Sequence, residues 1–143
     1  MSTATYDPSQ IVVTLGGNVL TGFGPEQFLS VKRDEASFTD EAGVDGEVVR
    51  VRKHDKRATV ELTLMQSSSS NDVLAASLEV DETIGSGVGA FMAKDLNGTT
   101  LLSSANAWVS KQPDGDFGKD ATARTWTIRC ERLVGKIGGI RRP

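Results

Sequence analysis

Residues 57 to 83 constrain the fold most, because they join an alternating segment to the pattern of one helix. The apolar residues of the alternating segment are Ala58, Val60, Leu62 and Leu64, and the polar residues between them are Thr59, Glu61 and Thr63. This period of two predicts a strand with one buried face and one solvent-exposed face. The serines at 67–70, with Asn71 and Asp72 after them, supply capping groups and an acidic first turn. They predict a single helix over 70–82.

The rest of the chain is typical of short strands joined by tight turns. Apolar runs at 11–15 and 19–23 flank a Gly-Gly-Asn turn, and alternation returns at 28–33. Further strands are expected at 90–94 and 99–103, whereas 105–110 fits either a strand or a helical turn. The longest strand is expected at 122–134, with Trp126, Ile128 and Cys130 inward and Thr127, Arg129 and Glu131 outward. With 15 glycines and few aromatic residues, the 143-residue chain is expected to be one mainly β domain.

Charge is distributed unevenly between residues 34 and 57. Segment 34–47 has no basic residue and six acidic ones, namely Asp34, Glu35, Asp40, Glu41, Asp45 and Glu47. Segment 48–57 has one acidic residue, Asp55, and five basic ones, namely Arg50, Arg52, Lys53, Lys56 and Arg57. We expect 34–47 to be a long acidic loop, since loops of this length are typically functional or mobile. The alternative is a hairpin with two solvated faces. Outside this region, residues 1–9 are expected to be an arm and residues 135–143 a basic tail.

The chain shows no pattern typical of a catalytic or metal site. His54 is the only histidine, and no second histidine or cysteine completes a zinc site with it. Cys130 is expected on an inward strand face, where a free cysteine acts as a small hydrophobe. The glycine pattern at 85–90 follows a helix and precedes a strand, which is the reverse of the order that phosphate binding requires. We therefore expect no enzyme activity, no metal and no cofactor.

Charge and hydropathy exclude two further classes of protein. The net charge of −3 argues against a basic nucleic-acid binder. The N-terminus has no basic-then-apolar leader, and no apolar run approaches the roughly 20 residues that span a bilayer. A soluble cytoplasmic protein with no membrane anchoring is expected.

Several short motifs follow one another in an informative order. They are the run 58–66 with the serines and Asn71-Asp72-Val73-Leu74 after it, Gly89-Ala90-Phe91 leading to 94–101, Ala107-Trp108, Phe117-Gly118, and 124–128. In this order and spacing, over about residues 10–140, the chain resembles the tail tube proteins of contractile-tail phages. The resemblance implies an antiparallel β-sandwich or partly closed barrel with one flanking helix. The ring-forming tube protein of type VI secretion shares that fold.

The resemblance also implies an assembly. Members of the family form hexameric rings that stack into a hollow tube inside a contractile sheath, and the genome passes through the tube. The implied partners are further copies of the chain, the sheath, the tape-measure protein, and the baseplate and terminator proteins. The implied location is the virion tail tube, assembled in the cytoplasm of the host bacterium. The alternatives are a terminator or baseplate ring on the same fold, or a tube ring like that of type VI secretion.

Two groups of site residues are expected from this assembly. By position, the acidic segment 34–47 corresponds to the loop that reaches the adjacent ring, where it could meet Arg50, Arg52, Lys53 and Arg57 of the next subunit. A filament requires such a contact between two different surface patches. The candidates for the channel wall are the outward residues of two strands, namely Thr59, Glu61, Thr63, Thr127, Arg129 and Glu131.

Overall fold

The alternating segment forms strand β6 (Ala58–Leu64) at the centre of one layer of the fold. The structure is a computed structural model, and it describes residues 3–140. On one side β6 pairs along its whole length with β9 (Arg124–Cys130), and on the other side with β3 (Leu29–Arg33). Both pairings are antiparallel, and their register places inward residues opposite inward residues, such as Leu62 opposite Trp126.

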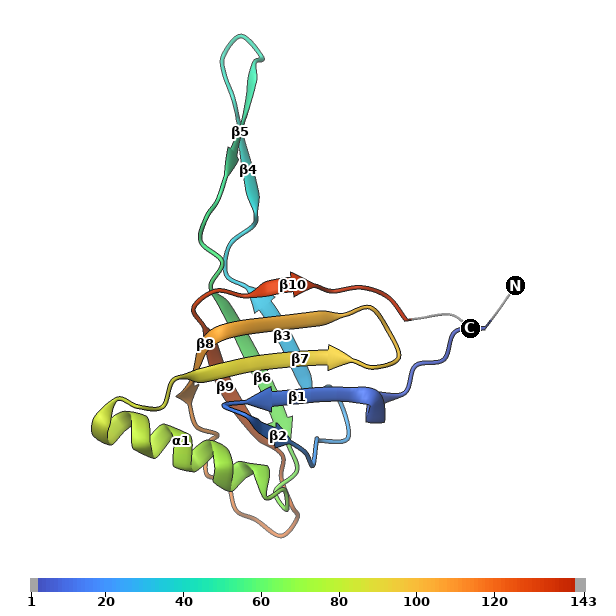
Figure 1. The fold of residues 1–143 in the computed structure, drawn as a ribbon, viewed down its shortest axis with the longest axis vertical. Helices are drawn as coiled ribbons and strands as arrows, with labels where there is room; N and C mark the ends of the chain where they lie inside the picture. The colour runs from blue at the N-terminus through green and yellow to red at the C-terminus, as the bar shows by residue number, and fades with distance from the viewer. Residues whose placement is uncertain (1–2, 141–143) are drawn as a thin grey trace.

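The remaining strands continue the same antiparallel sheet. They are β1 (Ile11–Leu15), β2 (Asn18–Leu20), β7 (Gly89–Asp95) and β8 (Leu101–Lys111), and the strand order is β2-β1-β7-β8-β9-β6-β3. A short strand, β10 (Val134–Lys136), also pairs with β8. The sheet curls, so that β1, β7 and β8 cross in front of β3, β6 and β9 (Figure 1). The fold is therefore mainly β and partly closed, as expected.

The hydrophobic core lies between these two layers. Val60, Leu62 and Leu64 of β6 are completely buried, and Phe91 of β7 lies among the largest buried side chains. From β9, the inward residues are Trp126 and Ile128, with Cys130 after them, as the alternation predicts. Burial of this apolar face stabilises the sheet, because each large side chain removed from water contributes about 1.5–3 kcal/mol.

One helix, α1 (Ser70–Ile84), covers the lower end of the sheet in Figure 1. Its Leu74 is completely buried, and Val73 and Leu78 pack against the core. The serine tract starts the helix, since the Ser68 hydroxyl accepts a hydrogen bond from the Ser70 N–H at 3.2 Å. The helix ends at Gly85, whose φ of +72° suits glycine. The helix predicted at 70–82 is thus confirmed, with two further residues at its end.

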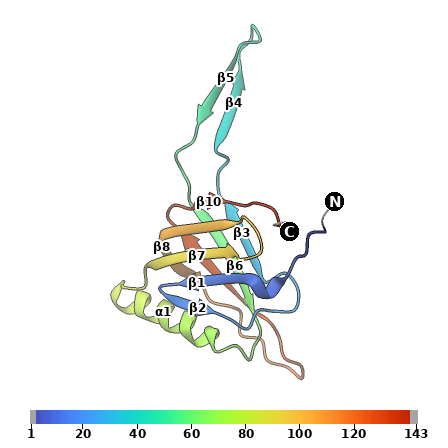
Figure 2. The same ribbon diagram turned by 45° about the vertical axis from the view of Figure 1, so that its right-hand side comes forward.

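Segment 34–47 is not a loop throughout, and the hairpin given as the alternative is what the structure shows. Residues Phe38–Ala42 form strand β4, which pairs antiparallel with β5 (Val48–Arg52) as a separate two-stranded sheet. This hairpin stands away from the body of the protein in both ribbon views (Figures 1 and 2). The sequence did not decide between loop and hairpin, because neither face of the hairpin is buried against its own chain and so no apolar face marks the strands.

Other boundaries also differ from the expectations. The longest strand is β8, which includes the ambiguous residues 105–110, and the strand expected at 122–134 ends at Cys130. The expected tail at 135–143 begins as part of β10, and Ile140 forms a bridge with Gly98. Residues 141–143 of that tail and residues 1–2 of the expected arm lie outside the described residues. In the arm, Pro8–Gln10 forms a 3-10 turn. No helix among residues 3–140 is long and apolar enough to span a membrane.

Candidate assembly surfaces

The β4–β5 hairpin exposes apolar residues that no part of its own chain covers. All five residues of β5 are exposed, and so are four of the five in β4. The exposed apolar side chains are Phe38, Val44, Val48, Val49 and Val51. An isolated two-stranded sheet is only marginally stable in water, so a hairpin with exposed apolar side chains suits contact with another molecule. The hairpin is therefore the first candidate assembly surface.

The hairpin carries both acidic and basic residues, and one such pair lies directly opposite in its register. Asp40 faces Arg50 across the β4–β5 register, and Glu41 faces Val49. The Arg50 guanidinium lies 4.3 Å above the ring of Phe38, which adds a cation–π contact. The structure thus brings together most of the expected inter-ring residues, namely Asp40, Glu41, Asp45, Glu47, Arg50 and Arg52, at one end of the molecule.

An ion pair fixes the root of the hairpin to the main sheet. Both guanidinium nitrogens of Arg129 on β9 donate to the Asp34 carboxylate, at 3.0 and 2.6 Å. Thr59 of β6 donates to Asp34 and accepts from Arg129. The hydrogen bonds from Arg129 hold the pKa of Asp34 below its usual range and raise that of Arg129. Asp34 was expected at a ring contact and Arg129 at the channel wall, but here they bind each other.

Arg57 is also engaged within its own chain. Its guanidinium donates to the carboxylate of Asp55, and the ion pair measures 2.9 Å. These hydrogen bonds lower the pKa of Asp55. Glu35 lies between the ion-paired Asp34 and the start of β4, and its side chain is exposed.

The outer face of β6 and β9 carries most of the expected channel residues. Thr59 lies opposite Arg129 and Glu61 lies opposite Thr127 in the β6–β9 register. Thr63 accepts or donates a hydrogen bond of 3.2 Å with Thr125. Glu131 follows the end of β9, and its carboxylate accepts a hydrogen bond of 2.9 Å from Asn106. The outer face is therefore polar and mixed in charge, with Glu131 at its margin.

A pocket of about 380 Å³ lies at the hairpin root, and sequence analysis did not find it. It is lined by Ser37, Phe38, Arg52, Lys53, His54, Lys56 and Arg132. Arg132 lies after β9, far in the sequence from the other lining residues, so the sequence does not show that they form one cluster. Five of the seven lining residues are basic types and none is acidic, so the pocket suits a carboxylate or another anion.

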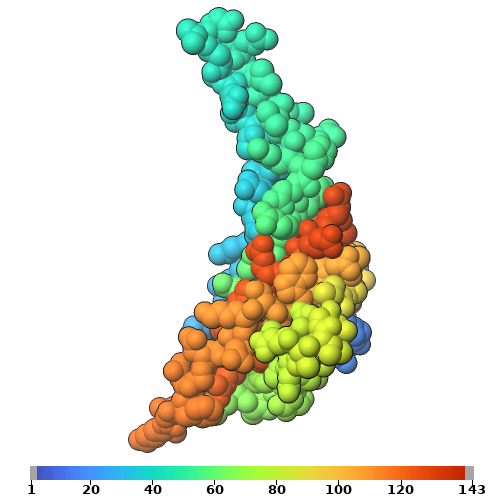
Figure 3. Space-filling view, turned by 90° about the vertical axis from the view of Figure 1, so that its left-hand side faces the viewer, coloured from blue at the N-terminus to red at the C-terminus, as the bar shows by residue number. Residues whose placement is uncertain are grey.

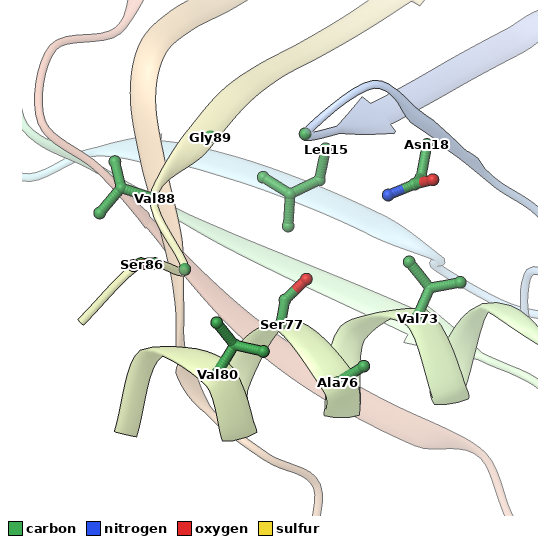
Figure 4. A pocket seen from close by; sticks show the side chains of 11 residues that line it. Leu15, Asn18, Val73, Ala76, Ser77, Val80, Ser86, Val88 and Gly89 are labelled. Carbon is green, nitrogen blue, oxygen red and sulfur yellow. The ribbon is translucent and has the colours of Figure 1, made fainter. Parts of the chain in front are cut away.

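A second hollow, of about 490 Å³, lies between α1 and the turn that joins β1 to β2. Val73, Ala76 and Val80 of the helix face Leu15 and Val88 across it (Figure 4). Its polar groups include the side chains of Ser77 and Asn18, which Figure 4 shows on opposite sides. No charged side chain lines this groove.

Two further observations concern metal binding and the reactivity of Cys130. Among residues 3–140, no group of three or more histidine, cysteine, aspartate and glutamate side chains is placed to hold a metal ion. Burial raises the pKa of the Cys130 thiol to about 11, against a smaller opposing effect of a hydrogen bond with Ser104. A thiol with such a pKa is not a nucleophile at neutral pH.

Comparison with known proteins gives the chain its family. No family model matches it. It is 32% identical over 145 residues to structural protein ORF10 of Pseudomonas phage KPP10, covering 96% of this chain and 84% of that protein.

Three solved structures share the fold at low sequence identity. The tube-terminating cap of the anti-feeding prophage matches with a TM-score of 0.61 at 14% identity, over 95% of this chain and 93% of its own. The sheath/tube terminator of the extracellular contractile injection system PVC matches with a TM-score of 0.59 at 12% identity, over 94% of this chain and 99% of its own. A chain of the PVC sheath-tube complex matches with a TM-score of 0.57 at 13% identity, over 92% of this chain and 91% of its own. By its identity and coverage, the chain belongs to the family of the phage structural protein ORF10, on a fold that contractile injection systems also use.

Proposed function

We propose that the chain is a ring-forming subunit of the inner tube assembly of a contractile phage tail. The observation that carries the proposal is the β4–β5 hairpin, which projects from the body with exposed valines and charges and has no surface of its own chain to cover it. The fold supports the same role, since its neighbours among solved structures come from sheath, tube and terminator assemblies. The role is structural, and it assigns no catalytic residue.

Two positions in such an assembly suit the chain. The terminator, a ring that closes the end of the tube, is favoured by the fold comparison, because the cap and the terminator match with TM-scores of 0.61 and 0.59. The stacked tube subunit is the second candidate. It is favoured by the hairpin, which projects from the body and suits contact with a neighbouring ring. In either position the implied partners are the tube and the sheath.

The channel is assigned to the outer face of β6 and β9 in this proposal. Thr59, Glu61 and Thr127 then face the channel, and the hexameric ring expected from the family encloses it. A net charge of −3 on each chain gives about −18 on six chains, which disfavours adhesion of DNA to the wall by repulsion of like charges. The tape-measure protein and the DNA are transient occupants in this scheme.

Electron microscopy of the purified chain tests the role directly. Negative-stain images are expected to show rings, either single or stacked, and only the stacked form fits the tube subunit. A variant with Asp40, Glu41 and Asp45 changed to lysine should keep its circular dichroism spectrum but lose stacking or attachment. The matched control changes Asp114, Asp116 and Asp120 to lysine, which alters the net charge equally on a different loop. A chain that stays monomeric at high concentration and is absent from purified tails would refute the proposal.

A further inference from the structure

We infer that the basic pocket at the hairpin root binds the acidic outer face of α1 from a second copy of the chain, arranged head to tail. The inference rests on the proposed ring-forming role and names the contact between successive rings. It gives an acidic partner to Lys53, Lys56 and Arg132. That partner, α1, lies outside the charged region 34–57.

The pocket is positive without internal compensation. Lys53 and Lys56 are half-buried in its wall, whereas Arg52, His54 and Arg132 are exposed at its edge. Two acidic residues adjoin the lining residues in the sequence: Asp55 forms the ion pair with Arg57, and Glu131 accepts a hydrogen bond from Asn106. A concave surface lined by cations concentrates positive potential, and it favours a partner that carries several carboxylates.

The outer face of α1 is that kind of partner. The helix contains Asp72, Glu79, Asp81 and Glu82 and no lysine or arginine. Asp72, Glu79 and Glu82 are exposed and spaced by seven and three residues, which places them on one side of a helix. Asp81 lies on the opposite side, and its carboxylate accepts a hydrogen bond of 3.4 Å from the Gly87 N–H. Three carboxylates therefore form a stripe that faces away from the core.

The two surfaces lie at opposite ends of the body from which the hairpin projects. The hairpin root is at the upper end of the body and α1 is at the lower end, in the ribbon views and in the space-filling view (Figures 1, 2 and 3). They cannot meet within one chain. A second copy shifted along the long axis brings its α1 towards the root of the first, which is a heterologous contact that can repeat. The acidic hairpin residues Asp40 and Glu41 are at the same end as the pocket, so α1 supplies the carboxylates for the pocket in this arrangement, and the hairpin tip is a separate contact.

A complementation experiment tests the contact in the full chain. The root variant carries Lys53→Glu and Lys56→Glu, and the helix variant carries Glu79→Lys and Glu82→Lys. In sedimentation velocity at low salt, each variant alone should associate at least about tenfold more weakly than the wild type. An equimolar mixture should regain association, because the intact root of one variant meets the intact helix of the other. The association should weaken as salt screens the charges.

Controls and outcomes separate this contact from the proposed function. Asp114→Lys with Asp116→Lys gives the same charge change as the helix variant and should leave association unchanged. If charge reversal unfolds the root variant, Lys53→Gln with Lys56→Gln replaces it. The inference is overturned if mixing restores nothing, or if wild-type rings never associate head to tail. In the second case, intact rings would leave the ring-forming role standing and would favour the terminator. Binding of a short DNA duplex that needs Lys53 and Lys56, without self-association, would also overturn it and indicate a nucleic-acid site.

Discussion

Replacing Leu62 with alanine tests whether the alternation of β6 determines the core. Leu62 is 0% exposed at the centre of β6, opposite Leu29 on one neighbouring strand and Trp126 on the other. The substitution removes the equivalent of about three CH2 groups at roughly 0.8 kcal/mol each. The residual cavity adds about 24 cal/mol for each Å³ that does not collapse, so the expected loss is about 2.5–4 kcal/mol.

Urea unfolding followed by tryptophan fluorescence measures this loss. The midpoint should fall without a change in the slope m, and the melting temperature should drop by roughly 6–15 °C. The protein concentration must be the same for all variants and low enough that the chain is monomeric, because assembly would add to the apparent stability. The domain should still fold, since about 3 kcal/mol is less than the total stability of roughly 5–15 kcal/mol.

The neighbouring residue supplies the matched control. Glu61 is exposed on the opposite face of the same strand, and Glu61→Ala should change the free energy of unfolding by less than about 0.5 kcal/mol. If Glu61→Ala is as costly as Leu62→Ala, or if both are neutral, the assignment of the buried face is refuted.

The remaining predictions concern pH, thiol reactivity and the C-terminal strand. Because Arg129 lowers the folded-state pKa of Asp34, this carboxylate stabilises the protein above its unfolded pKa of about 3.9, and the contribution is lost as pH falls through the lower folded pKa. An NMR titration should show the pKa of Asp34 rising towards the usual value in Arg129→Gln. Cys130, whose pKa is raised to about 11, should react with a thiol reagent at pH 8 only after unfolding, and the stability should decline above about pH 8.5 as the unfolded thiol ionises. Gly135→Ala should detach β10 and increase hydrogen exchange at the β8 edge, because Gly135 has a φ of +112° and an added Cβ would lie 2.0 Å from the Leu101 carbonyl oxygen. Gly139→Ala, which meets nothing within 4 Å, is the control and should leave exchange unchanged.

The elements with a buried face were predictable, and those without one were not. The alternation at 58–64 predicted both the strand and its inward residues, because burial requires an apolar residue at every second position. The helix predicted at 70–82 was found from the serines before it and its acidic first turn, and Leu74 and Leu78 pack its inner side. For residues 38–42 the sequence left a loop and a hairpin open, since these residues bury almost nothing and local pattern carries no information about their pairing.

The candidate site residues also divide into features that are evident in the sequence and contacts that only the structure shows. The six acids of 34–47 and the basic residues after them are evident in the sequence, and so is the order of motifs that resembles the tail tube proteins. The pairing of Asp34 with Arg129, across 95 residues, is not evident, because it depends on how β9 lies against β6 and the hairpin root. The basic pocket needs Arg132 from the far end of the chain for the same reason.

By itself, the sequence determined a mainly β domain with one helix and an inward face at Val60, Leu62 and Ile128. These properties follow from local periodicity and from residue types that are present or missing. Only the tertiary structure decided that the charged segment is a projecting hairpin and that Asp34 and Arg129 hold its root. It also placed the basic pocket and the acidic outer face of α1 at opposite ends of the body. Only the fold decides which charges interact, because the interaction between two charges depends on their separation in space and not on their separation along the chain.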